Sequence, residues 1–359
     1  MEKALLVEIK LKSDPTPVEE SLEELKHLAR SAGAGIVGTL TQQRESPDIR
    51  TYVGSGKVEE LKALCASSGA DIVIVDADLS SSQTRNLEEE LGVKVVNRTE
   101  LILDIFAQHA HSREGNLQVA LAQNEYRLTR LSGRGIELSR LGGGIGTRGP
   151  GETKLEVDRR RVRSEISRLR NELEKVRKSR EMLREKRRAS SMVTVSLVGY
   201  TNAGKSSLMN ALAKAGVLVE NKLFATLDPV TRRLFLPSGR TVLLTDTVGF
   251  IRNIPHNLIS AFRATLEETT DADLLLHVVD ASSPYMQDQI DAVYRVLEEI
   301  KAVSKPVITV FNKSDLIEKA APVKALVKKY KPSAVVSASK KEGLDKLIGL
   351  LDRQLSPRT

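Results

Sequence analysis

Residues Val193–Ser206, VTVSLVGYTNAGKS, indicate the fold of the last part of the chain. Its apolar run, Val193–Val198, is typical of a buried strand, and Gly199–Ser206 matches the pattern G-x-x-x-x-G-K-S. In such a loop the glycines let backbone N–H groups surround phosphate oxygens, the lysine reaches the β- and γ-phosphates, and the serine hydroxyl binds Mg²⁺. Because a helix is expected over Ser207–Ala213, the stretch predicts a phosphate-binding loop between a strand and a helix.

Three later motifs, each after an expected strand, complete a guanine-nucleotide site. Asp246 follows the strand Thr241–Thr245 and is placed to hold the Mg²⁺ shell, while the N–H of Gly249 would contact the γ-phosphate. Asp315 ends the motif NKSD, where a carboxylate accepts from both N1–H and N2–H₂ of guanine, a pattern that adenine lacks. Ser337–Ser339 would direct backbone N–H groups toward guanine O6. The order of these motifs predicts a Ras-like P-loop GTPase domain over residues 191–359.

The segment Phe224–Thr231, FATLDPVT, is expected to respond to the γ-phosphate. A threonine here should complete the Mg²⁺ shell, and Thr226 is preferred over Thr231. Mg²⁺ is thus expected on Ser206, Thr226 and Asp246. The residues expected to contact GTP or GDP are Gly199, Asn202, Ala203, Gly204, Lys205, Ser206, Ser207, Phe224, Thr226, Asp246, Gly249, Asn312, Lys313, Asp315, Ser337, Ala338 and Ser339.

Hydrolysis is expected to be slow in the isolated protein. In Ras the residue that follows the glycine of this motif is a glutamine, which orients the attacking water. In this chain the residue after Gly249 is Phe250, whose side chain offers neither a hydrogen-bond donor nor an acceptor. Lys205, Thr226 and Gly249 are the other catalytic candidates. A turnover of about 10⁻⁴ to 10⁻² s⁻¹ is expected before a partner accelerates it. Asn202 is a candidate ligand for K⁺, and a loop residue with local hydrogen bonds is the alternative.

Residues 1–112 predict a small parallel α/β subdomain. Short strands rich in Val and Ile, over 4–9, 35–40, 71–75 and 93–96, alternate with helical patterns over 18–31, 57–66 and 82–91. The stretch Thr51–Lys57, TYVGSGK, lacks the first glycine and the final Ser or Thr of a phosphate loop. It is therefore expected to be a tight turn before a helix. Cys65, the single cysteine, is expected to be a small buried hydrophobic residue.

Residues 113–190 predict an antiparallel helical hairpin with a glycine-rich loop, 133–154, between its helices. Leucine or valine recurs every seven residues from Leu155 to Leu183, and a second apolar pattern runs from Leu117 to Leu131. This part has 21 basic and 11 acidic residues, whereas residues 1–112 have 12 and 19. The basic excess favours a surface that faces RNA or phosphate over a solvated charged face. The long loop favours a probe that orders on a partner over a flexible linker.

The composition excludes several classes of protein. Aromatic residues make up 3% of the chain and tryptophan is absent, which argues against a single-strand binder that stacks bases. One cysteine excludes a disulfide scaffold or a Cys-rich zinc module, and the five histidines form no metal-ligand pattern. No apolar run approaches 18 residues and the N-terminus lacks a signal-peptide core, so we expect a cytoplasmic protein without a membrane span.

The motifs GYTNAGKSS, FATLDP, DTVGF, NKSD and SAS, preceded by GGGIGTRGPGETKLE and a basic helix, resemble those of the HflX GTPases, in the Obg–HflX group. The resemblance covers essentially the whole chain. It implies an N-terminal HflX domain followed by the GTPase domain, and a GTPase activity that the ribosome stimulates. It also implies binding to the large ribosomal subunit, with the glycine-rich loop directed at the peptidyl-transferase region, and the splitting of stalled or stress-damaged ribosomes.

The residues expected to contact rRNA are Arg134, Arg140, Gly142, Gly143, Gly144, Arg148, Lys154, Arg159, Arg160 and Arg163. Two other functions stay open: a GTP-gated assembly factor of the large subunit, and a GTPase switch for a non-ribosomal protein that binds the hairpin as a coiled coil. We expect a monomer that binds no DNA. The sequence ends at Thr359, after a helix expected over 343–355, so the additional C-terminal domain of some HflX proteins is expected to be absent.

Overall fold

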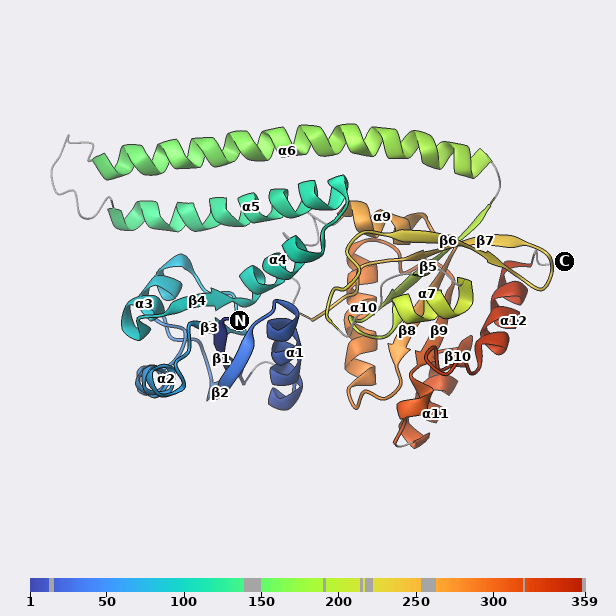
Figure 1. Ribbon diagram of the computed structural model, residues 1–359, viewed down its shortest axis with the longest axis horizontal. Helices are drawn as coiled ribbons and strands as arrows, with labels where there is room; N and C mark the ends of the chain where they lie inside the picture. Colours follow the sequence, from blue (N-terminus) through green and yellow to red (C-terminus); the bar gives the residue numbers. More distant parts are fainter. Residues whose placement is uncertain are drawn as a thin grey trace. The chain divides into compact units, whose positions relative to one another are not determined.

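The computed structural model describes residues 1–12, 16–138, 150–189, 192–213, 216, 222–252, 263–318 and 320–356. The chain divides into two compact units, whose elements are labelled in Figure 1. The first unit consists of Met1–Gln108 with Asn116–Glu174, and the second of His109–Gly115 with Lys175–Thr359. Each unit contains an α/β layer, so the predicted fold class is confirmed.

The first unit contains a four-stranded parallel sheet. Its strands are β1 (Lys3–Leu11), β2 (Gly35–Arg44), β3 (Ile72–Val75) and β4 (Lys94–Asn97), in the order β2-β1-β3-β4. The central strand β3 reads Ile-Val-Ile-Val, and all four residues are buried. Such a run without alternation is typical of a parallel sheet that is covered on both faces. The predicted small parallel layer is therefore confirmed.

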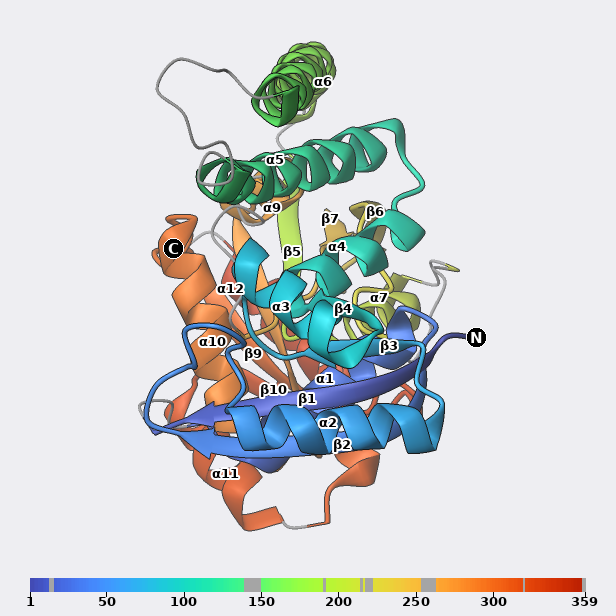
Figure 2. The ribbon, with the colours of Figure 1, turned by 90° about the vertical axis from the view of Figure 1, so that its left-hand side faces the viewer.

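Three helices connect these strands: α1 (Val18–Ser31), α2 (Ser55–Ser68) and α3 (Ser81–Leu91). Leu61 and Cys65 of α2 and Leu87 of α3 belong to one apolar core with the valines of β1, β3 and β4, and Figure 2 shows α2 against β1 and β2. Cys65 is buried there, as predicted. Residues 51–54 lead into α2, with Gly54 directly before the helix, and Ser55–Lys57 are already part of its first turn.

Helix α4, Arg98–His109, follows β4 directly and is not predicted by the sequence analysis. Its buried residues include the consecutive run Leu101, Ile102 and Leu103, followed by Ile105 and Phe106. Because apolar residues occupy several faces of this helix, the sequence lacks the one-sided 3.6-residue period that marks a helix at a surface.

The predicted hairpin is formed by α5 (Arg113–Leu138) and α6 (Pro150–Ala189), which run antiparallel in Figure 1. Leu121 of α5 packs in one cluster with Val162, Ile166 and Leu169 of α6, which are seam positions of the predicted heptads. The side chains of Leu155 and Leu183 lie outside the described residues. The boundary between the two units cuts both helices, after Gly115 in α5 and after Glu174 in α6.

The second unit is built on a six-stranded sheet. Its strands are β5 (Val193–Gly199), β6 (Val230–Phe235), β7 (Thr241–Asp246), β8 (Leu274–Asp280), β9 (Val307–Asn312) and β10 (Ser333–Val335). Their order is β10-β9-β8-β5-β7-β6, and all neighbours are parallel except β6 and β7. Parallel strands end at the same edge of a sheet, so the motifs after β5, β7, β9 and β10 are brought together there.

In the described part of the second unit the remaining helices are α7 (Lys205–Ala213), α9 (Arg263–Asp271), α10 (Met286–Glu299), α11 (Ala320–Lys329) and α12 (Leu344–Leu355), with a 3₁₀ turn over Ser314–Leu316. The core of the sheet combines Leu197, Leu244 and Leu276 from three strands with Leu208 of α7 and Leu347 of α12. No helix in the described part of the chain is both long enough and apolar enough to pass through a bilayer.

Candidate nucleotide site

The loop Gly199–Ser206 joins β5 to α7, and its lysine is held inside it. The ammonium of Lys205 donates to the carbonyl oxygens of Gly199 at 3.2 Å and Tyr200 at 3.0 Å, and the residue is buried. Burial lowers the pKa of this ammonium to about 8, while the nearby Asp246 carboxylate opposes the shift. The charged ammonium is therefore buried at the N-terminus of α7, where anionic oxygens are favoured.

Three oxygen-bearing side chains converge beside this loop. The Ser206 hydroxyl donates to Asp246 Oδ2 at 2.6 Å, and the Thr226 hydroxyl lies 2.9 Å from the Ser206 hydroxyl and 3.3 Å from Asp246 Oδ2. Thr231, the alternative to Thr226, lies in β6 instead, with its hydroxyl 2.9 Å from that of Thr245. The structure thus brings together the three residues expected around Mg²⁺.

The chemistry of this group fits a hard divalent cation. Asp246 is fully buried, and its second oxygen, Oδ1, has no hydrogen-bond partner among the residues that the structure describes. Burial raises the pKa of Asp246, and the Lys205 ammonium counteracts this. A buried carboxylate oxygen without a partner is costly, and a carboxylate with two hydroxyl groups is the kind of oxygen set that Mg²⁺ binds together with phosphate oxygens.

The NKSD motif connects the two ends of the site. The side-chain amide of Asn312 donates to the Ala203 carbonyl at 3.0 Å and accepts from the Ala338 N–H at 3.1 Å. The Lys313 ammonium pairs with Asp280 of β8 at 2.7 Å. One loop is thereby fixed against both the phosphate loop and the segment Ser337–Ser339.

The carboxylate of Asp315 is oriented by two serines. Ser337 donates to Oδ1 at 2.5 Å and Ser339 donates to Oδ2 at 3.2 Å. The Ser337 hydroxyl is the main reason that the pKa of Asp315 lies below its usual value, so the group is ionised at neutral pH. An ionised carboxylate held by side chains on both oxygens is suited to accept two N–H groups of one ligand.

A pocket of about 370 Å³ lies over these residues. The predicted contact residues that line it are Asn202, Gly204, Lys205, Ser206, Ser207, Phe224, Thr226, Gly249, Asn312, Lys313, Asp315, Ala338 and Ser339. The other four, Gly199, Ala203, Asp246 and Ser337, do not line it; Ala203, Asp246 and Ser337 are buried behind it.

The pocket is also lined by Thr201, Lys222, Ala225, Thr247 and Leu316, which the sequence analysis did not single out. Thr201, Ala225 and Thr247 lie within the motifs, and Leu316 directly follows NKSD, so their position in the sequence could have marked them as pocket residues. Lys222 lies before the Phe224 segment, in no motif, and only the fold brings it to the pocket.

Gly249 and Phe250 play different structural parts. A Cβ atom on Gly249 would lie 2.9 Å from the Lys205 Nζ and 2.8 Å from the Thr201 Cα, so only glycine fits there. Phe250 is almost fully buried and does not line the pocket. Its backbone N–H donates to Gly199 at 3.0 Å and its carbonyl accepts from Thr201 at 2.7 Å. Phe250 therefore joins β7 to the phosphate loop.

Three residues of the pocket other than glycine have a left-handed backbone. Asn202 has a φ of 59°, Phe224 a φ of 58° and Lys313 a φ of 60°, conformations that cost energy for residues other than glycine. Phe224 is buried while it lines the pocket, so its ring is fixed by packing. Such strained residues cluster at ligand sites in proteins.

The residues expected to face rRNA are only partly described. Arg160 and Arg163 are exposed on α6, and Arg159 is partly buried. Arg134 lies in α5 and Lys154 in α6, but their side chains lie outside the described residues, as do Arg140, Gly142, Gly143, Gly144 and Arg148 altogether. Elsewhere on α6, Arg168 pairs with Glu165 and Arg170 with Glu125.

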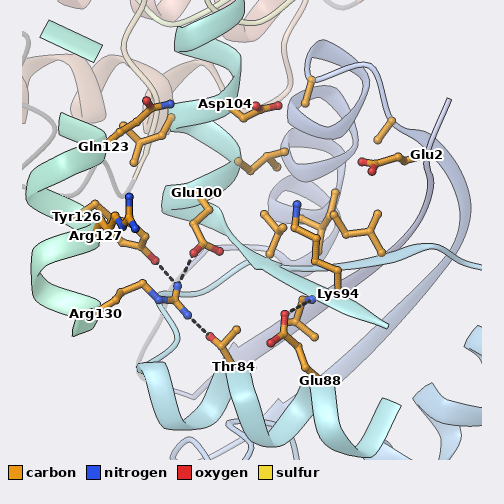
Figure 3. Close-up of a pocket in the computed structure, with 18 of the residues that line it drawn as sticks. Glu2, Thr84, Glu88, Lys94, Glu100, Asp104, Gln123, Tyr126, Arg127 and Arg130 are labelled. Atoms are coloured by element: carbon orange, nitrogen blue, oxygen red, sulfur yellow. Dashed lines mark hydrogen bonds and ion pairs between the residues drawn. The ribbon is translucent and has the colours of Figure 1, made fainter. Parts of the chain in front are cut away.

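A larger pocket, of about 960 Å³, lies in the first unit and is drawn in Figure 3. At its edge Arg130 donates to Glu100, to the Tyr126 hydroxyl and to Thr84, each at 2.6 Å. These contacts satisfy the guanidinium within the protein. Among the residues that the structure describes with their side chains, none of those predicted to contact nucleotide, metal or rRNA lines this pocket.

Comparison with known families covers most of the chain. Residues 19–107 match the family model described as GTP-binding GTPase N-terminal, residues 109–187 the GTP-binding GTPase middle region, and residues 194–313 the 50S ribosome-binding GTPase model. Among solved structures, a GTP-binding protein from the archaeon Sulfolobus solfataricus in complex with GDP is 26% identical, with a TM-score of 0.50 over 99% of this chain and 100% of that one.

Curated relatives are more similar still. GTPase HflX of Caldanaerobacter subterraneus subsp. tengcongensis is 52% identical over 358 residues, which are 100% of this chain and 82% of the relative. GTPase HflX of Escherichia coli K12 is 45% identical over 356 residues, 99% of this chain and 83% of the relative. With the three-part match to GTPase models and the geometry of the P-loop unit, these identities place the chain in the HflX GTPase family.

Proposed function

We propose that this chain is a cytoplasmic, monomeric GTPase that binds the large ribosomal subunit and uses GTP to split stalled or stress-damaged ribosomes. The observation that carries the GTP part is the convergence of Ser206, Thr226 and Asp246 beside Lys205, opposite an oriented Asp315. The ribosomal part is supported by the family relation, including the matching model described as a 50S ribosome-binding GTPase.

In this proposal each residue has a defined part in GTP binding. Asp315 accepts the two guanine N–H groups, and Asn312 keeps the guanine side of the pocket at a fixed distance from the phosphate loop. Lys205 gives up its contacts with Gly199 and Tyr200 and donates to the β- and γ-phosphate oxygens instead. Its charge counteracts the negative charge that spreads over the phosphate oxygens in the transition state.

The residues that would hold Mg²⁺ are Ser206, Thr226 and Asp246. When bound there, Mg²⁺ would supply positive charge that counteracts the negative charge on the phosphate oxygens. The Gly249 N–H is proposed to donate to the γ-phosphate, in a place where any side chain would collide with Lys205. Thr226 would keep its position while the γ-phosphate is present and leave it after hydrolysis.

Hydrolysis is proposed to depend on the ribosome. The buried ring of Phe250 offers no group that orients water, and it lies outside the pocket. We therefore expect the isolated protein to turn over at about 10⁻⁴ to 10⁻² s⁻¹ and the ribosome to raise this rate. Asn202, which lines the pocket, is the proposed ligand of an activating K⁺. A rate well above 1 s⁻¹ without ribosomes would contradict the first point, and equal rates in Na⁺ and K⁺ would contradict the second.

The ribosome contact is proposed to use the hairpin. Its residues 113–190 have 21 basic and 11 acidic residues, which suits a polyanionic partner. The proposed rRNA contacts are Arg134, Arg140, Gly142, Gly143, Gly144, Arg148, Lys154, Arg159, Arg160 and Arg163. The exposed guanidinium groups of Arg160 and Arg163 on α6 support this assignment.

Sedimentation of ribosomes with the protein tests the proposal. With a non-hydrolysable GTP analogue, 70S particles should separate into subunits, and with GDP they should stay intact. Deleting Gly142–Gly151 should abolish splitting and leave GTP affinity nearly unchanged; a loss of GTP affinity would contradict the separation of the two sites. Binding to free large subunits alone would indicate an assembly factor, and no association at moderate salt would indicate a non-ribosomal partner.

A further inference from the structure

A side chain from the segment Phe224–Thr231 binds the two residues that directly precede helix α5. The carboxylate of Asp228 accepts from the backbone N–H of His111 at 3.0 Å and of Ser112 at 2.7 Å, and it also accepts from the Ser112 hydroxyl. The Ser112 hydroxyl in turn accepts from the Gly115 N–H at 2.8 Å. A negative charge at this end of a helix satisfies N–H groups that have no partner within the helix and is favoured by the helix dipole.

Asp228 is tied closely to the nucleotide pocket. It lies two residues after Thr226, so the chain between their Cα atoms spans at most about 7 Å. Leu227 between them is buried, and Pro229 and the strand β6 follow at once. Because only one residue, the buried Leu227, separates Thr226 from Asp228, we expect a displacement of Thr226 to move the carboxylate of Asp228 as well.

Ion pairs made by Arg180 also fix the first turn of α5. Arg180 of α6 donates to Glu114 of the first turn at 2.8 Å and to Glu267 of α9 at 3.0 Å. Helix α9 is the first described element after the motif Asp246–Phe250. Segments that follow two nucleotide motifs therefore meet at the start of α5, and all of these residues belong to the second unit.

Close packing at this point requires glycine. A Cβ atom on Gly115 would lie 2.4 Å from Asp228 Oδ1 and 3.2 Å from the Ser112 hydroxyl. Any side chain at 115 would push the carboxylate away from the N–H groups that it accepts. From Asn116 onward, the same helix continues as part of the first unit and of the hairpin.

We propose that Asp228 is a positioning residue that couples the nucleotide state to the hairpin. With GTP bound, its carboxylate holds His111 and Ser112 at the start of α5. With GDP bound, these hydrogen bonds are lost and the start of α5 is released. The inference rests on the proposed role of Thr226 and extends it, since Thr226 then governs a helix as well as the metal shell. Neither Asp228 nor Gly115 lines the nucleotide pocket, so both can be changed without removing a nucleotide contact.

Amide hydrogen exchange of the full chain tests the inference, with GDP or a non-hydrolysable GTP analogue, both with Mg²⁺. In the wild type we expect the amides of residues 110–116 to exchange about tenfold more slowly with the analogue. Asp228→Asn and Gly115→Ala, which disturb the contact from opposite sides, should each remove this difference. Alanine favours helix more than glycine does, so a loose turn in Gly115→Ala is not explained by helix propensity. Nucleotide affinity should change by less than about threefold, a limit that corresponds to roughly 0.65 kcal/mol.

Asp352→Asn is the matched control. Asp352 also accepts from a serine N–H and hydroxyl, those of Ser238 at 3.0 and 2.6 Å, but lies in α12 and does not line the pocket. It should keep the wild-type difference. Protection of residues 224–229 by the analogue without protection of 110–116 overturns the inference and leaves the proposed function intact. If both nucleotides bind and neither segment responds, the role of Thr226 fails and the inference fails with it.

Discussion

The side-chain amide of Asn312 donates to the carbonyl oxygen of Ala203 at 3.0 Å. Its own carbonyl oxygen accepts from the Ala338 N–H at 3.1 Å. One buried side chain thus joins the phosphate loop to the loop that follows β10. A Cβ atom on Gly204 would lie 2.3 Å from the Asn312 amide nitrogen, so this contact also explains a glycine of the phosphate loop.

Asn312→Ala should weaken GTP and GDP binding by the same factor. The change leaves the Ala203 carbonyl and the Ala338 N–H without a partner, which costs about 1–3 kcal/mol for each buried group. Both nucleotides contact the same two loops, so their affinity ratio should stay at the wild-type value. Titration with fluorescent GDP and GTP analogues measures this. A change confined to GTP would mean that Asn312 acts on the γ-phosphate rather than on the loops.

Asp315→Asn should change base specificity. The carboxylate accepts two N–H groups of guanine in the proposed complex, and an amide can accept only one and presents a donor to the other. Loss of a paired polar contact of this kind is expected to weaken GTP binding by about 10²-fold or more. Xanthosine triphosphate, which has a carbonyl in place of the guanine amino group, should bind the variant better than GTP does. Competition binding with both nucleotides checks this, and retained preference for GTP would contradict it.

Thr226→Ala should separate GTP from GDP. The variant lacks a hydroxyl that lies 2.9 Å from Ser206, so affinity for a GTP analogue is expected to fall by about 10- to 100-fold, the range for a hydrogen bond to a charged group. Affinity for GDP should stay within about twofold, because this hydroxyl acts only with the γ-phosphate present. Thr231→Ala is the control, since its hydroxyl pairs with Thr245. Equal losses in the two variants would contradict the choice of Thr226.

Glu8→Gln should stabilise the protein at alkaline pH. Glu8 is buried on β1. Burial and the Asp76 carboxylate raise its pKa to about 9. Because the folded pKa lies above the unfolded value, this group contributes stability that is full below about pH 4.5 and is lost as pH rises through 9. The amide of glutamine stays neutral, so the variant should lose less stability than the wild type between pH 6 and 9.

Thermal unfolding at several pH values measures this difference. The neighbouring carboxylate of Asp76 behaves in the opposite way and serves for comparison. Arg98 pairs with Asp76 at 2.5 Å, and the pKa of Asp76 stays lowered in spite of burial. The stability that ionised Asp76 contributes is lost only at acid pH, as the pH falls below the usual pKa of an aspartate. Parallel curves for wild type and Glu8→Gln across the alkaline range would show that Glu8 is ionised in the folded protein.

Patterns along the chain were enough to predict the series of nucleotide motifs, the heptad repeat of the hairpin and the parallel layer of the first unit. These features depend on spacing along the chain, such as a strand that ends at Gly199 or leucines seven residues apart. Sequence patterns also predicted a buried Cys65, because its neighbours Leu61 and Leu64 mark one face of a helix.

Features that depend on residues far apart along the chain became visible only in the folded structure. It placed Thr226 rather than Thr231 beside Ser206, and it buried Phe250, which does not line the pocket. It brought Asp228 to Ser112, 116 residues away in sequence. No local pattern encodes such contacts, because hydrogen bonds and steric fit between remote segments arise only when the sheet and its helices have packed.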